Sequence, residues 1–216
     1  MIVQEFSFPK DNLHYFIGIG TLIDMKVEFD DLFELIELIQ NRFEGVMLQF
    51  FNSRLILSYN HIFYAAYHTL KTFNLKTNIS NKKGIEFLLY IAASRQIKRA
   101  LEYYGISMQQ LNQGTIDFCI ISMNTDLEII LKDILCKINV KERNLELAKK
   151  SYAKYEIIKE YFGINENQIK VVLKSYGVNF DDIQSNKNGI NYLYLAIEDL
   201  ICEKMVLLSL EKISNE

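Results

Sequence analysis

The chain has too few cysteines, too widely spaced, to build a covalent or metal-held framework. It has only Cys119, Cys136 and Cys202 in 216 residues. An odd number at such long intervals fits neither a disulfide framework nor a zinc site. We therefore expect small, buried, reduced thiols and a cytoplasmic location.

Long apolar runs and linker sequences are also missing. Residues 16–23 are interrupted by Gly18, Gly20 and Thr21, and a membrane-spanning helix needs about 20 consecutive apolar residues. The N-terminus lacks a basic start followed by an apolar core, so we expect neither a secretory signal nor a membrane partner. Pro9 is the only proline and no low-complexity linker precedes the last third, so we expect one domain over residues 1–216.

The sequence lacks the short motifs of common catalytic and cofactor sites. Gly18-Ile19-Gly20 has no third glycine and no helix start after it, as a dinucleotide site would require. Nucleophile elbows and phosphate-binding glycine loops are absent too. His61 and His68 are seven residues apart, too far for one metal in the usual i, i+4 pairing. We predict no catalytic residue, no metal and no cofactor.

Hydrophobic periodicity predicts an α+β fold. Residues 15–23, 46–51 and 115–123 are rich in β-formers and read as strands, and residues 55–57 are a candidate extension of the sheet. Helical spacing covers residues 30–42, 60–73, 84–93, 94–104, 126–137 and 189–210. Ser94 is the expected N-cap of the fourth of these helices. We predict a small, largely antiparallel mixed sheet flanked by several helices, with a helical C-terminal region.

Three aromatic-glycine-aliphatic segments indicate helix ends. They are residues 104–106, 161–164 and 175–178. A left-handed glycine followed by an apolar residue that folds back is a common helix stop. We expect this geometry at Gly105 and at the two later glycines. In the helix that Gly105 would end, Ile97, Ala100, Leu101 and Tyr104 are expected to form the inward side.

The net charge of −3 hides a basic middle in an acidic protein. Residues 1–53 carry 3 basic and 9 acidic side chains, residues 54–103 carry 8 and 2, and residues 104–216 carry 13 and 16. This pattern favours a local anion-binding patch over general polycation behaviour. A solvated face that mates with the acidic first third is the alternative.

Aromatic side chains are interleaved with the basic ones in this middle region. Tyr64, Tyr67, His68 and Lys71 share one side of a predicted helix, and Lys82 and Lys83 lie in a polar loop. Arg95, Lys98 and Arg99 share the outward side of a later helix. Cations for phosphates together with aromatic faces for unstacked bases are typical of single-stranded RNA binding. Alternatively, the tyrosines belong to the core and the lysines are merely solvated.

The last helix has more apolar surface than one buried side requires. Ile190, Leu193, Ile197, Ile201 and Leu208 can face the core. A second apolar strip remains, made of Leu195, Val206, Leu207 and Leu210. Such a strip is a candidate protein-docking surface, and a helix buried on two sides is the alternative.

Several motifs resemble the small-subunit family of the KEOPS complex, called the PRPK-binding protein in animals. The family's hallmark is a glutamate, two apolar residues and a leucine, followed by the pattern RQIxxALxxxGI. Here these stand as residues 86–89 and 95–106, with Asn52, His61 and Ala65 before them. Residues 196–210 are similar to the family's last helix. The likeness is dense over residues 50–123, whereas residues 140–189 are longer than in compact archaeal members and form a candidate variable helical extension.

The resemblance implies a non-catalytic subunit of the complex that makes threonylcarbamoyladenosine in tRNA. Such a subunit binds a small Bud-type atypical kinase or ATPase and grips the single-stranded CCA end of tRNA. The transfer reaction belongs to a separate ASKHA-fold subunit, an indirect partner. Asparagine-, isoleucine- and lysine-rich usage suits an archaeal source.

Only Arg95, Gln96, Asn52 and His61 occupy matching motif positions. The wider candidate RNA site extends this set by charge and helical phase: Tyr64, Tyr67, His68, Lys71, Lys82, Lys83, Arg95, Gln96, Lys98 and Arg99. The apolar strip is the candidate kinase-docking surface, expected far from the basic residues.

Two other functions remain open at this point. A pure protein-interaction regulator of the kinase would need no RNA binding. A small hydrolase or nuclease would use His68 as general base with Glu86, although nothing in the sequence brings these two residues together.

Overall fold

The computed structural model describes residues 1–8, 13–123, 125–183 and 188–210. Its sheet is antiparallel and open, with strand order β1-β2-β4-β3: β1 is Ile2–Phe8, β2 Leu13–Ile23, β4 Ile116–Ser122 and β3 Met47–Phe51. A short strand, β5 (Lys141–Arg143), pairs with the end of β2. The predicted strands at residues 15–23, 46–51 and 115–123 are confirmed. β1 and β5 were not predicted, and residues 55–57 form a buried loop, not a strand.

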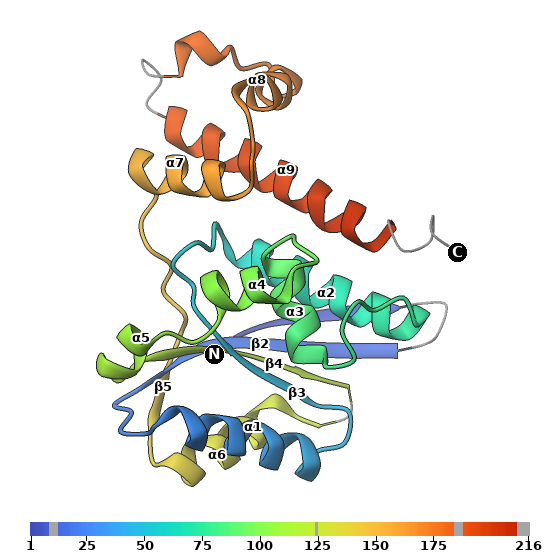
Figure 1. Ribbon diagram of the computed structural model, residues 1–216, viewed down its shortest axis with the longest axis vertical. Helices are drawn as coiled ribbons and strands as arrows, with labels where there is room; N and C mark the ends of the chain where they lie inside the picture. The colour runs from blue at the N-terminus through green and yellow to red at the C-terminus, as the bar shows by residue number, and fades with distance from the viewer. Residues whose placement is uncertain (9–12, 124, 184–187, 211–216) are drawn as a thin grey trace.

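Helices cover both faces of the sheet (Figure 1). On one face lie α1 (Phe29–Arg42) and α6 (Leu127–Ile138); on the other lie α2 (Tyr59–Leu75), α3 (Lys83–Ile91) and α4 (Ile97–Tyr104). The short α5 (Met108–Asn112) precedes β4. A further layer, α7 (Tyr152–Tyr161), α8 (Glu166–Ser175), the 3-10 turn Phe180–Asp182 and α9 (Gly189–Leu210), rests on α2 and α3. The predicted α+β class is confirmed.

Alternation along the strands sends side chains into two separate cores. Ile17, Cys119 and Ile121 point into the cluster shared with α2–α4 and α7–α9. Leu48, Phe118 and Ile120 point into the cluster shared with α1 and α6. Because successive side chains of a strand point to opposite faces, β2, β3 and β4 each contribute residues to both cores. A Cβ on Gly20 would lie 2.6 Å from the Phe118 ring, so this glycine serves packing.

The segment 140–189 joins the first core. Tyr155 and Ile158 of α7, and Ile169 and Leu173 of α8, are buried in the same cluster as the sheet residues. Lys154, 9% exposed, donates from Nζ to the carbonyl oxygen of Ile56 at 2.6 Å, and its burial lowers the pKa of the ammonium to about 8. The segment therefore packs in the same hydrophobic core as the sheet.

Two of the three predicted glycine helix stops have the expected geometry. Gly163 and Gly177 have φ of 59° and 72° and follow α7 and α8. The expectation for Gly105 is wrong, because its φ is −69° and its backbone is extended. Glycine fits there for another reason: a Cβ would lie 2.4 Å from the carbonyl oxygen of Leu101.

The start and the inward side of α4 also differ from the prediction. The N-cap is Gln96, and Ser94 instead accepts a hydrogen bond from the Gln96 amide at 3.2 Å. Ala100 and Tyr104 are buried as expected, but Ile97 and Leu101 are 45% and 44% exposed. This short helix packs on α3 through Ala100 and Tyr104, and Ile97 and Leu101 face solvent.

None of the helices in the described part of the chain is long and apolar enough to cross a bilayer.

His61 is buried and hydrogen-bonded on both ring nitrogens. Nδ1 accepts from the Leu57 amide at 3.4 Å, so Nε2 donates to the carbonyl oxygen of Ile91 at 3.0 Å. Burial lowers the pKa of His61 to about 4, aided by the charge of Lys154. The ring is therefore a neutral connection between the start of α2 and the end of α3.

Stability should fall as the pH decreases from about 6.5 toward 4. Burial lowers the pKa of His61 and also that of His68 to about 4, whereas the unfolded chain binds these protons near pH 6.5. Each histidine then contributes up to about 1.4 kcal/mol per pH unit to the loss. Urea denaturation between pH 6.5 and 5 measures the slope.

The control is His14→Asn, since His14 is exposed, and it should keep the wild-type slope. His61→Asn and His68→Asn should each flatten the slope. An equal slope in all three variants would contradict this assignment.

Candidate functional site

A pocket between α2, α9 and β1 collects part of the predicted RNA site. It has a volume of about 360 Å³. We call it the α2–α9 pocket; its lining is Phe6, Tyr64, Tyr67, His68, Lys71, Cys202 and Val206. The four predicted residues of α2 thus lie together, as their helical spacing indicated. Phe6 was missed because its strand was not recognised, and Cys202 because its contact with α2 is a matter of tertiary packing.

The two tyrosines in this pocket differ in what their rings can offer. Tyr67 stacks on Phe8, with ring centroids 5.4 Å apart and planes 4° from parallel, and also contacts Phe6. Tyr64 is 43% exposed. Tyr64 is therefore the ring with a free face for a ligand.

His68 lies at the inner side of the same pocket. It is 7% exposed and stacks on Tyr90, with centroids 5.3 Å apart. Burial, assisted by the charge of Lys71, lowers its pKa to about 4. Its Nδ1 is buried and has no hydrogen-bond partner among the described residues.

Glu86 is committed to the fold. It is fully buried, and its carboxylate accepts hydrogen bonds from the amides of Ile79 and Ser80 at 2.7–3.0 Å and from the Thr72 hydroxyl at 3.2 Å. These contacts hold the loop before α3 against α2. On the side of His68 that faces α3, the ring of Tyr90 stacks on the imidazole. Within the described residues, no hydrogen bond joins His68 to Glu86. The arrangement does not support a general-base pair.

The polar residues predicted for RNA binding in and just before α3 and α4 divide into an exposed group and a group that contacts the fold. Lys82, Gln96 and Lys98 are exposed and available. Lys83 lies over the Phe73 ring at 5.8 Å, and burial lowers the pKa of its ammonium. Arg99 lies over the Tyr161 ring at 4.6 Å and donates to the carbonyl oxygen of Tyr161. Lys83 and Arg99 thus also hold the fold together.

Arg95 connects the basic side of the molecule to the last helix. Its Nη1 donates to the carbonyl oxygen of Leu208 at 3.4 Å, in the last turn of α9. A cation at a helix C-terminus is favourable because carbonyl groups there lack intrahelical donors. Arg95 therefore has a structural contact in addition to any ligand contact.

The apolar strip of α9 stays outside the core. Leu195, Val206, Leu207 and Leu210 are 46%, 42%, 48% and 51% exposed. The residues expected to face inward, Leu193, Ile197, Ile201 and Leu208, are buried, and Ile190 is partly buried. The alternative of a helix buried on two sides is therefore not what the structure shows for these four residues.

The two candidate surfaces meet. Val206 belongs to the apolar strip and also lines the α2–α9 pocket beside Tyr64 and Lys71. The expectation that the kinase-docking surface lies far from the basic residues is wrong at this end of α9, because α9 packs along α2. Leu195 lies eleven residues earlier on α9 and does not line this pocket.

An antiparallel α+β sheet with helices on both faces, and a small pocket between α2, α9 and β1, define the class of this protein. Within the described residues, no three His, Cys, Asp or Glu side chains are grouped to hold a metal ion. The concave site combines aromatic, apolar and cationic side chains.

Residues 30–209 match the model of a protein family described as "Kinase binding protein CGI-121". The chain belongs to this kinase-binding family, the small-subunit family of KEOPS that residues 86–106 resemble. A search of curated proteins gives no match.

Replacing Glu86 with glutamine should destabilise the fold. The new amide would direct N–H groups at the amides of Ile79 and Ser80, which now donate to the carboxylate. Hydrogen bonds to a charged group contribute about 1.5–3 kcal/mol, so we expect a loss of about 2–3 kcal/mol in the free energy of unfolding. Urea denaturation measures it.

Glu102→Gln, on the exposed side of α4, is the matched control and should change stability by less than about 0.5 kcal/mol. Equal stabilities for the two variants would show that the carboxylate of Glu86 is not needed by the loop.

Proposed function

We propose that the chain is a non-catalytic subunit of the KEOPS tRNA-modification complex that holds the CCA end of tRNA and docks on the Bud-type kinase. The observation that carries the proposal is the α2–α9 pocket. There, residues proposed for RNA binding and one proposed for kinase docking line the same hollow. The ASKHA-fold transferase is then an indirect partner, and we place the complex in the cytoplasm.

The pocket has the chemistry that a single-stranded RNA end requires. Its volume of about 360 Å³ falls within the range of small-ligand pockets, about 300–1,000 Å³. Tyr64 offers a ring face for a base, and the ammonium of Lys71 offers a charge for a phosphate. Lys82, Gln96 and Lys98 extend the polar surface for the preceding nucleotides.

The kinase surface is supported by the family match and by the exposure of α9. Four large apolar side chains on one helix in water are unfavourable by about 25 cal/mol for each Å² left uncovered. A partner that covers them recovers this free energy. Because Val206 borders the pocket, an RNA end in the pocket would lie next to the docked kinase.

One observation favours the alternative, a kinase regulator without RNA binding of its own. Lys83, Arg95 and Arg99 all contact groups within the fold. Their charges therefore contribute to packing, and the RNA site depends mainly on Lys71, Lys82, Lys98 and the aromatic side chains.

The RNA site can be tested with Lys71→Glu and Tyr64→Ala. We expect Lys71→Glu to weaken tRNA binding about tenfold or more and to lower the salt slope of log affinity by about 0.7 per lost phosphate contact. Tyr64→Ala should lose about 1–3 kcal/mol of stacking. Fluorescence anisotropy with tRNA carrying or lacking its CCA end measures both.

Lys174→Glu on α8 and Tyr152→Ala on α7 are matched controls on exposed positions and should bind like the wild type. Wild-type binding that does not change when CCA is removed would remove the pocket from the RNA site. No binding of either RNA would leave the regulator alternative.

Kinase docking can be tested with Leu207→Asp. A charge within the apolar strip should weaken kinase binding at least tenfold while tRNA affinity is unchanged, because Leu207 does not line the pocket. Val171→Asp, at a 70% exposed position on α8, is the control. Calorimetric titration with the purified kinase measures both variants, and equal affinities would exclude this end of α9 from the interface.

A further inference from the structure

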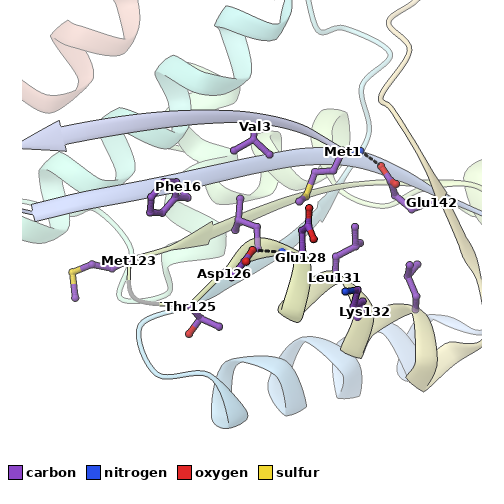
Figure 2. Close-up of a pocket in the computed structure, with 12 residues that line it drawn as sticks. Met1, Val3, Phe16, Met123, Thr125, Asp126, Glu128, Leu131, Lys132 and Glu142 are labelled. Carbon is purple, nitrogen blue, oxygen red and sulfur yellow. Dashed lines mark hydrogen bonds and ion pairs between the residues drawn. The ribbon is translucent and has the colours of Figure 1, made fainter.

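A second hollow lies on the opposite side of the sheet, between α6 and the strands β1 and β2 (Figure 2). Its volume is about 780 Å³. We call it the α6 groove. Its apolar lining is Met1, Val3, Phe16, Met123, Leu127, Leu131 and Leu135, and its polar lining is Thr125, Asp126, Glu128, Lys132 and Glu142.

The groove exists because the helical layer on this face ends before the sheet does. Helix α1 packs on β3, and α6 packs on β2 and β4. The edge strand β1 extends past them, and Val3 and Phe16 are left 51% and 38% exposed. The space beside α6 is where the next helix of the layer would lie, about 8–10 Å from its axis.

The charges on the rim of the groove follow a fixed order along α6. Asp126 caps the helix by accepting from the Glu128 amide at 2.8 Å, and Glu128 and Lys132 follow at successive turns. Both side chains stand at the groove in Figure 2. In the described part of the chain, neither the Glu128 carboxylate nor the Lys132 ammonium has an ion-pair partner. The Met1 amino group and Glu142 already neutralise each other.

A helix that lies in this groove must therefore place a base beside Glu128 and an acid beside Lys132. Helix α6 itself, turned antiparallel, meets both conditions. Lys132 of a second copy would face Glu128, and Glu128 of the second copy would face Lys132. Antiparallel helices also bring opposite ends of their dipoles together. A purely basic segment would leave Lys132 opposite a like charge.

We propose that the occupant of the α6 groove is a second copy of this chain, related by a two-fold axis near the level of residue 130. Such an interface is isologous, since each copy offers the same surface to the other. The half-buried Leu131, next to the axis, would meet its counterpart, and Val3 and Phe16 would be covered. This dimer leaves the α2–α9 pocket and the apolar strip free and does not depend on the proposed function.

The test is a charge swap followed by sedimentation equilibrium from micromolar to near-millimolar concentration. The wild type should dimerise with rising concentration. Glu128→Lys and Lys132→Glu should each weaken the dimer about tenfold, because two attractive pairs become repulsive. The double variant Glu128→Lys/Lys132→Glu should dimerise like the wild type, since it restores both pairs.

Glu37→Lys on α1 and Lys137→Glu near the end of α6 are controls for net charge and should not weaken the dimer. A wild type that stays monomeric at every concentration would overturn the proposal. So would a dimer that both single variants retain, or one that is lost in Leu207→Asp, which would place the contact on α9.

Discussion

Burial of β2 and β4 on both faces is the constraint on which the rest of the structure depends. All seven residues of β4 are buried, as are Ile17–Leu22 of β2. A strand pair with no solvent face needs a helical layer on each side. Helices α1 and α6 cover one face of the sheet, and α2, α3 and α4 cover the other. The sheet therefore lies between two hydrophobic cores. Where a layer falls short of the sheet, as beside β1, a groove is left.

The last third of the chain adds a further helical layer to this sheet with helices on both faces. Because α9 lies along α2 and continues to the turn that Arg95 contacts, one helix both completes the core and borders the α2–α9 pocket. Cations on both sides of the contact serve this packing, Arg99 from α4 and Lys154 from α7. Arg99 contacts Tyr161 and Lys154 contacts Ile56, so part of the basic charge secures α7 to the body of the protein.

Much of the fold was predictable from sequence, and the failures have identifiable causes. The strands of the sheet centre and all the long helices follow from periodicity, because their buried sides repeat along the chain. β1 was missed because an edge strand buries only Ile2, Phe6 and Phe8, and these only partly, so its pattern is weak. The left-handed turn predicted at Gly105 is found at Gly163 and Gly177 but not at Gly105. A glycine can be required because φ is positive or because a Cβ would clash, and the sequence does not distinguish these two reasons.

Fold class, family and the sides of the individual helices follow from the amino-acid sequence alone. The common side of Tyr64, Tyr67, His68 and Lys71 and the outward strip of α9 are examples. These properties depend on residues three or four apart, which the helix brings together without outside help. Only the tertiary structure decided which of these sides share a pocket, which cations are engaged inside the fold and where the sheet is left bare. Those outcomes depend on contacts between elements far apart in the chain, and no local pattern records them.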